Sequence, residues 1–299
     1  MLVKTMELLT VAARHNVGVL AFNVIGFEHA EAIVLGAEAE QSPVILQVSQ
    51  NAIAYRLGLI APIGRACNEL AAQAAVPVSL HLDHATTRDL CERAADVGFS
   101  SIMYDGSSLS YDDNVEKTAA LSDWAHQNGI GIEGELGVVG GKGGVLTTPE
   151  GMTDPGMATR YVAATGVDAL AVAVGSEHGM VERRARLDLD RIEQLHDAVP
   201  VPLVLHGSSG VTDTDLVAAV KRGMTKINLA TQLNTAFTAA IRSYLKVDEA
   251  VVDPRRYGER GRAVMVDVVR DRCWLVGSSG RAHDFLLEGG GDREVVRNL

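Results

Sequence analysis

Residues 76–84 read Val-Pro-Val-Ser-Leu-His-Leu-Asp-His. An apolar run that follows a proline predicts a buried strand, and Asp83 and His84 lie at its carboxyl end, where the backbone turns into a loop. An acid beside a potential metal ligand at a strand end suits a catalytic site. Taken alone, the stretch is explained more simply as a helix N-cap, because Asp83 and Thr86 precede a helical pattern at residues 88–97. The rest of the chain decides between these interpretations.

The strand and helix of this stretch form a unit that recurs along the chain. Continuous apolar strands alternate with helical patterns, which favours parallel pairing. We predict eight strands, at residues 17–23, 43–48, 76–84, 100–104, 129–135, 167–174, 202–205 and 224–228. Eight is the closure number of a (β/α)₈ TIM barrel, which we therefore predict. An open doubly wound sheet is the alternative, although no Gly-x-Gly-x-x-Gly motif follows the first strand.

Helical patterns follow the strands, and the chain continues beyond the last unit. They lie at residues 28–40, within 52–74, at 88–97, 112–127, from 154, at 188–198, 213–221 and 231–246. A turn at Asp253-Pro254 and an amphipathic helix at 256–273 form a C-terminal helical extension. Because residues 276–299 contain glycine clusters, we expect a single domain over residues 1–282 and a mobile tail over 283–299.

The composition limits the classes of partner. The chain has 299 residues, 47% of them hydrophobic, and a net charge of −11. This charge opposes binding to nucleic acid and to anionic membranes, so an anionic substrate needs a local positive centre such as a metal ion or a helix N-terminus. The three cysteines form no Cys-x-x-Cys pair, and we find neither a signal peptide nor a membrane-spanning apolar run. We expect a cytoplasmic protein.

Polar residues follow strand after strand at the same end. They are Asn23, Ser49, Asp83, His84, Asp105, Glu135, His178, His206 and Asn228. Each has a simple explanation alone, as a turn former, a capped loop histidine or a solvated charge. Their coincidence at one rim of the predicted barrel favours a functional site, because barrel enzymes build their sites at that rim.

Two kinds of binding are indicated at this rim. His84, His178 and His206 suit Zn²⁺, which takes imidazole nitrogens and leaves one position open in catalytic sites. His81 lies inside its strand, where we expect a packed or supporting residue. The loops Gly207-Ser208-Ser209-Gly210 and 228–231 follow the last two strands, where this fold often binds phosphate. A plain turn and an N-cap at Thr231 are the alternatives.

These residues match the motifs of a known family. The chain resembles the class II (zinc-dependent) fructose-bisphosphate and tagatose-bisphosphate aldolases over roughly residues 1–282. The resemblance rests on Ala21-Phe22-Asn23, Ser42-Pro43-Val44-Ile45-Leu46, His81-Leu82-Asp83-His84, Tyr104-Asp105-Gly106-Ser107, Glu133-Gly134-Glu135-Leu136-Gly137, Val204-Leu205-His206-Gly207, Lys226-Ile227-Asn228 and Tyr257.

The resemblance implies a role for each residue at the rim. His84, His178 and His206 would hold a catalytic Zn²⁺, and Asp105 and Glu135 would form a second metal position. Asp83 would exchange the proton of the C4 hydroxyl. The dihydroxyacetone phosphate half would be bound by Gly179, Gly207, Ser208, Ser209, Asn228, Ala230 and Thr231, with Asn23 and Ser49 nearby.

The resemblance also implies partners. Backbone carbonyls near Gly179 and Gly207 would hold a monovalent cation (Na⁺ or K⁺). The substrate would be a phosphorylated sugar, and the protein a homodimer or homotetramer in which Arg255 reaches a phosphate in the neighbouring subunit.

The expected reaction cleaves or forms the C3–C4 bond of a ketose 1,6-bisphosphate, either fructose or tagatose 1,6-bisphosphate. Zn²⁺ as a Lewis acid would stabilise the resulting enediolate, so no Schiff-base lysine is required. The only lysine near a strand end is Lys226, two residues before Asn228. Asp83 lies beside a zinc ligand, where it can act as the base.

One segment departs from the family pattern. The loop after Glu135 carries an acidic proton donor in many members, but Gly140-Gly141-Lys142-Gly143-Gly144 contains no carboxylate. Glu150 is the nearest replacement, and a different donor is the alternative. Ser208 stands where fructose-bisphosphate enzymes often have glycine, which is nearer the tagatose-type pattern.

Two other functions stay open. One is a related aldolase for another ketose phosphate or for a deoxy-sugar-acid phosphate. The other is a non-catalytic barrel that binds metal and phosphate, which the basic glycine-rich loop favours.

Overall fold

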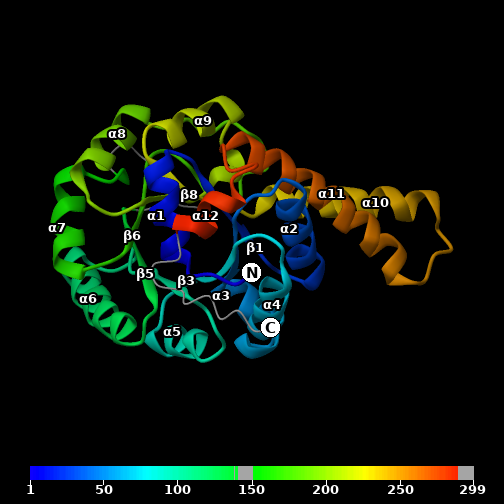
Figure 1. The fold of residues 1–299 in the computed structure, drawn as a ribbon, viewed down its shortest axis with the longest axis horizontal. Helices are drawn as coiled ribbons and strands as arrows, with labels where there is room; N and C mark the ends of the chain where they lie inside the picture. The colour runs from blue at the N-terminus through cyan, green and yellow to red at the C-terminus, as the bar shows by residue number, and fades with distance from the viewer. Residues whose placement is uncertain (138, 141–150, 289–299) are drawn as a thin grey trace.

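The computed structural model describes residues 1–137, 139–140 and 151–288. In these ranges, eight parallel strands form a closed barrel whose order follows the chain (Figure 1). β1 and β8 close the barrel, with Val19 opposite Lys226. The strands are β1 (Val19–Asn23), β2 (Val44–Ser49), β3 (Val78–Ala85), β4 (Ser101–Tyr104), β5 (Gly131–Leu136), β6 (Ala169–Val172), β7 (Leu203–Leu205) and β8 (Met224–Leu229). The predicted (β/α)₈ TIM barrel is confirmed.

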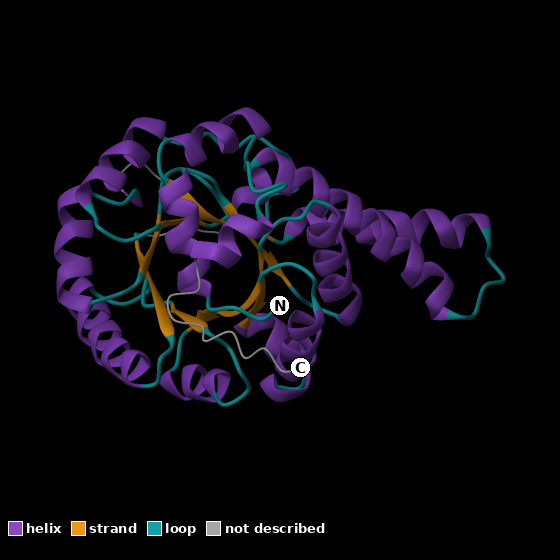
Figure 2. Cartoon of the chain, in the orientation of Figure 1, coloured by secondary structure: helices purple, strands orange, loops and turns teal. Residues whose placement is uncertain are grey.

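A ring of helices surrounds the strands (Figure 2). The ring contains α2 (Phe27–Ala39), α3 (Gln50–Tyr55), α4 (Ile60–Gln73), α5 (Arg88–Ala95), α6 (Tyr111–Gln127), α7 (Pro155–Thr165), α8 (Leu189–Ala198) and α9 (Asp213–Lys221). The helix predicted within residues 52–74 is divided into α3 and α4. Leu57 and Gly58 between them have φ values of 61° and 72°, which a right-handed helix cannot accept.

The N-terminal end of the barrel is closed by a helix that the sequence patterns did not predict. Leu8 and Leu9 of α1 (Thr5–His15) belong to one buried cluster with Val19, Ile45 and other strand residues. Just before α1, the Val3 amide donates to the Val78 carbonyl at the start of β3, at 3.0 Å. The apolar cluster therefore fills this end and leaves the carboxyl ends of the strands for polar side chains.

The first part of the expected tail forms a helix. Ala282–Glu288 form α12, which lies beside α1 over the barrel end (Figure 1). Phe285 is only 2% exposed and packs in the same cluster as α1. His15 Nε2 also lies 2.8 Å from Glu288 Oε1. The remaining part of the predicted tail, residues 289–299, lies outside the described residues.

Two helices project from the barrel as an arm (Figure 1). The arm consists of α10 (Thr231–Val247) and α11 (Pro254–Leu275), and α11 packs against α2. Within α10, all of which the structure describes, Leu233 alone is buried. Val247 and Val252 near the tip are 87% and 91% exposed. Over the described ranges, none of the helices combines the length and apolar character needed to cross a membrane.

The packing of α12 generates a stability prediction. We expect Phe285→Ala to lower the free energy of unfolding by about 3 to 5 kcal/mol, because it removes a buried aromatic side chain and leaves a cavity. Leu287→Ala on the same helix is the control, since Leu287 is 68% exposed and its loss should cost less than about 0.5 kcal/mol. Urea unfolding followed by circular dichroism measures both. Equal midpoints for the two variants would contradict the packing.

Candidate active site

The predicted rim residues surround one cavity at the carboxyl ends of the strands. Its volume is about 190 Å³. It is lined by Asn23, Gln47, Ser49, Asn51, Asp83, His84, His178, Gly179, His206, Gly207, Ser209, Asn228, Ala230 and Thr231. The structure therefore brings together most of the predicted site residues. Among those residues, only Ser208, Asp105 and Glu135 are not part of the lining.

A local backbone distortion points the neighbours Asp83 and His84 into the same cavity. Successive residues of a regular strand face opposite sides. Here the register between β3 and β4 shifts between Leu82 and Ala85, and His84 has a φ of 53°. A bulge with a left-handed residue redirects a side chain, at a cost that functional sites often carry. The N-cap of α5 is Thr87, whose side chain accepts from the Leu90 amide, so Asp83 is not the cap.

Three imidazoles converge in the cavity. One ring nitrogen from each of His84, His178 and His206 lies within 4.8 Å of the others. His206 Nδ1 and His84 Nε2 are 3.0 Å apart. Burial, followed by the proximity of His84, holds the pKa of His206 well below its usual range. The neutral imidazole that results is the form that binds metal ions.

Two carboxylates lie on the other side of the His84 ring. His84 Nδ1 is 2.9 Å from Asp105 Oδ2 and 3.6 Å from Glu135 Oε2. Ser107 Oγ donates to Asp105 Oδ1 at 2.6 Å, which fixes this carboxylate. The carboxylates can either orient the His84 ring by accepting its Nδ1 proton or provide oxygen ligands for a second cation.

Asp83 is a buried carboxylate held from one side. Asn23 Nδ2 donates to Asp83 Oδ2 at 2.9 Å, and Gln47 Nε2 donates to Asn23 Oδ1 at 2.8 Å. Burial alone would raise the pKa of Asp83, but His84, His206 and Lys226 outweigh burial and lower it to about 2. Asp83 Oδ1 is buried without a hydrogen-bond partner among the described residues and lies 3.9 Å from His84 Nε2. Asp83 therefore contributes an ionised carboxylate to the cavity lining.

The opposite wall is made of glycine loops and a helix N-terminus. Gly207 has a φ of 67°, and a Cβ there would lie 2.6 Å from the carbonyl oxygen of Glu177. Only glycine allows this approach. The N-cap of α10 is Ala230, and Thr231 is the first residue of the helix. Both residues line the cavity, so the first turn of α10 starts there. Such an arrangement suits an anion. Ser208 Oγ instead donates to the Leu205 carbonyl at 3.0 Å.

Sequence patterns did not identify several polar neighbours of the site. Gln47 and Asn51 line the cavity, and Glu133 lies 3.0 Å from His206. The alternation of side chains along a strand could have identified two of them. Gln47 and Glu133 lie two residues before Ser49 and Glu135, and therefore on the same face of their strands. Residues 141–150, which include most of the glycine-rich loop and Glu150, lie outside the described residues.

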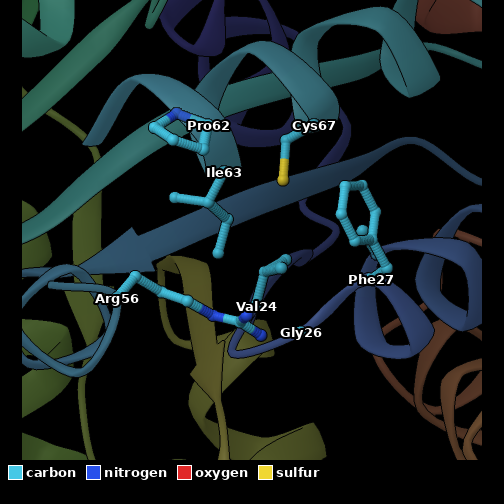
Figure 3. A pocket seen from close by; sticks show the side chains of 8 residues that line it. Val24, Gly26, Phe27, Arg56, Pro62, Ile63 and Cys67 are labelled. Carbon is cyan, nitrogen blue, oxygen red and sulfur yellow. The ribbon is translucent and has the colours of Figure 1, made fainter. Parts of the chain in front are cut away.

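A second hollow of about 160 Å³ lies between α2 and α4, away from the imidazoles (Figure 3). Val24, Ile63 and Cys67 are among its mostly apolar lining. The Arg56 guanidinium at its edge donates to the Ile25 carbonyl at 2.8 Å. The chemical groups of the site are therefore gathered in the rim cavity.

Comparison with known proteins agrees with this geometry. The protein-family model described as "Fructose-bisphosphate aldolase class-II" matches residues 3–281 of the chain. The chain belongs to the class II fructose-bisphosphate aldolase family. This confirms the resemblance seen in the sequence. Aldolases are lyases, so the family assignment makes the chain a lyase. Members of this family generally depend on a metal ion.

Relatives of the chain carry two aldolase names. A fructose-bisphosphate aldolase of Geobacillus stearothermophilus is 37% identical over 284 residues, which cover 94% of this chain and 99% of the relative. A 6-phospho-5-dehydro-2-deoxy-D-gluconate aldolase of Shouchella clausii is 36% identical and covers 92% of this chain and 94% of the relative. The crystal structure of the YdjI aldolase from Escherichia coli K12 superposes with a TM-score of 0.83 at 29% identity, covering 94% of this chain and 100% of that one.

The convergence of the imidazoles generates a metal-binding prediction. We expect His178→Ala to weaken Zn²⁺ binding at least about 100-fold, because one of three nitrogen ligands is lost. His126→Ala is the matched control, since His126 pairs with Asp168 on the outer surface. Titration against a chromophoric chelator measures both affinities. Unchanged affinity in His178→Ala would show that this residue is not a ligand.

Proposed function

We propose that this chain is a zinc-dependent aldolase that cleaves or forms a ketose 1,6-bisphosphate and releases dihydroxyacetone phosphate. The observation that carries the proposal is the buried Asp83 carboxylate, which lines the same cavity as the three imidazoles and has one oxygen without a hydrogen-bond partner among the described residues. The donor set fits Zn²⁺, because three nitrogens leave a position for substrate. When bound, Zn²⁺ would supply Lewis-acid stabilisation of the negative charge left by cleavage.

In the cleavage direction, Asp83 takes the proton of the C4 hydroxyl. The C3–C4 bond then breaks, C4 becomes the aldehyde, and the electron pair stays on the dihydroxyacetone phosphate half, which later regains a proton at C3. A pKa of about 2 keeps Asp83 ionised at neutral pH. Asn23 restrains Oδ2 at 2.9 Å, which leaves Oδ1 for the hydroxyl proton.

The glycine loops and the start of α10 would hold the phosphate of the dihydroxyacetone half. Gly179, Gly207, Ser209, Ala230 and Thr231 line this wall of the cavity. Carbonyls near Gly179 and Gly207 would also take Na⁺ or K⁺, and Asp105 and Glu135 would form a second metal position. The support for the latter is their approach to His84 Nδ1.

The aldehyde half of the substrate has two candidates. Relatives at nearly equal identity are named fructose-bisphosphate aldolase and 6-phospho-5-dehydro-2-deoxy-D-gluconate aldolase. We propose a bisphosphate first and a deoxy-sugar-acid phosphate as the alternative. Both leave the same dihydroxyacetone phosphate half, so they share the site described above.

We also propose a homodimer or homotetramer. The arm supports this, because α10 buries only Leu233 among its described residues and its tip exposes Val247 and Val252. The Arg255 side chain near the tip is 88% exposed, which is compatible with a contact to a phosphate in a neighbouring copy.

The three cysteines are buried free thiols, which fits a cytoplasmic location.

Activity assays test the proposed reaction. We expect the protein to release dihydroxyacetone phosphate from at least one member of a panel of phosphorylated ketoses that also includes the deoxy-sugar-acid phosphate. The release is measured by the enzyme-coupled reduction of dihydroxyacetone phosphate with NADH. Activity should disappear after exhaustive chelation and return with added Zn²⁺. Activity that survives chelation without added metal would exclude the zinc mechanism. Zinc binding without release from any substrate would favour a non-catalytic barrel.

Asp83→Asn separates proton transfer from metal binding. We expect kcat to fall about 10²- to 10⁴-fold, because the amide cannot act as a base, while bound zinc stays near one equivalent. Asp123→Asn, on the exposed face of α6, is the isosteric control and should retain full activity. If Asp83→Asn kept its turnover, another group would have to take the hydroxyl proton.

A further inference from the structure

A buried ion pair lies beneath the metal site inside the barrel. Glu133 of β5 and Lys226 of β8 are both 0% exposed. Lys226 Nζ lies 2.7 Å from Glu133 Oε2. His81 Nε2 is 3.6 Å from the same oxygen, and His81 Nδ1 bonds Ser101 Oγ at 2.7 Å. None of Glu133, Lys226 and His81 belongs to the lining of the rim cavity, so no substrate contact explains them.

The two oxygens of Glu133 serve different partners. Oε2 faces Lys226, whereas Oε1 lies 3.0 Å from His206 Nε2. A carboxylate can only accept, so His206 must carry its proton on Nε2. His206 Nδ1 then presents its lone pair on the side where His84 Nε2 lies, 3.0 Å away. Asn228 Nδ2 also lies 3.2 Å from Nε2 and 3.4 Å from Nδ1, but the Glu133 carboxylate is the contact that requires a proton on Nε2 and leaves Nδ1 for a cation.

We propose that Glu133, held in place by Lys226, is a positioning residue for the metal, because it selects the tautomer and ring orientation of His206. This inference rests on the proposed metal site. A carboxylate behind a histidine ligand raises the basicity of the ligand and restrains its ring. Lys226 completes the arrangement by binding the other oxygen, so that Glu133 cannot rotate away from His206.

A purely structural ion pair explains the arrangement less well. Replacing a buried pair with apolar side chains is often neutral or stabilising, so burial of charge alone gives little reason for the pair. The barrel interior accepts apolar side chains at nearby positions, as Val19 and Ile45 show. Glu133, in contrast, is in direct contact with a predicted ligand, where loss of the carboxylate has a specific consequence.

Metal affinity tests the inference without relying on catalysis. We expect Glu133→Gln in the full-length protein to bind Zn²⁺ about 10- to 100-fold more weakly in chelator competition. A single amide oxygen cannot satisfy both Lys226 and His206, and its NH₂ group repels both donors. Ser42→Ala is the control, because it removes a buried hydroxyl that bonds Ser278 Oγ at 2.8 Å, at the opposite end of the barrel. It should bind Zn²⁺ with unchanged affinity.

Nitrogen NMR of the unchanged, metal-free protein, labelled with ¹⁵N at histidine, gives a second readout that needs no stable variant. We expect His206 to be the Nε2–H tautomer. An Nδ1–H tautomer would overturn the inference, as would equal zinc affinity in Glu133→Gln and the unchanged protein. Failure of the unchanged protein to bind Zn²⁺ would instead overturn the proposed function together with this inference, so the two failures are distinguishable.

Discussion

The left-handed backbone of His84 is the constraint on which the site depends. With a φ of 53°, it allows Asp83 and His84, which are adjacent in the chain, to face one cavity. A non-glycine residue in this conformation costs about 1 to 3 kcal/mol unless its surroundings fix it. Here the Asp105 amide donates to the Ala85 carbonyl at 2.8 Å, and Asp105 Oδ2 lies 2.9 Å from the His84 ring. The same distortion thereby places the proposed base and a proposed metal ligand together.

Closure of the barrel then separates charge across the cavity. Carboxylates at the ends of β3, β4 and β5, namely Asp83, Asp105 and Glu135, lie around His84. The loops after β6 and β7 and the start of α10 contribute glycines and backbone amides. Among the described residues that line the cavity there is no lysine or arginine. One wall therefore favours a cation and the other an anion, in a protein whose overall charge is −11.

The predictable part of the molecule is the part that repeats locally. Most of each strand is apolar, and a polar residue lies at or near its carboxyl end, so both the barrel and its rim could be predicted. α1 and α12 could not be predicted, because they pack on the barrel end through contacts between residues distant in sequence. The glycines near α12 favoured a mobile tail, although Phe285 is part of the buried cluster. Ser208 was placed in the site by its neighbours, yet its hydroxyl bonds backbone. The pairing of Glu133 with Lys226 joins β5 to β8 across the interior, which no local pattern reveals.

The surroundings of Lys226 support the proposed metal-dependent cleavage over a Schiff-base mechanism. An amine that forms a Schiff base must be accessible to the substrate carbonyl and must be able to lose its proton. Lys226 is fully buried, lies outside the cavity lining and is paired with Glu133 at 2.7 Å, so its amine is not placed to meet a substrate carbonyl in the cavity. The same pairing directs Glu133 towards His206. The interaction that we propose to support the imidazole cluster thus also keeps Lys226 away from covalent chemistry in the cavity.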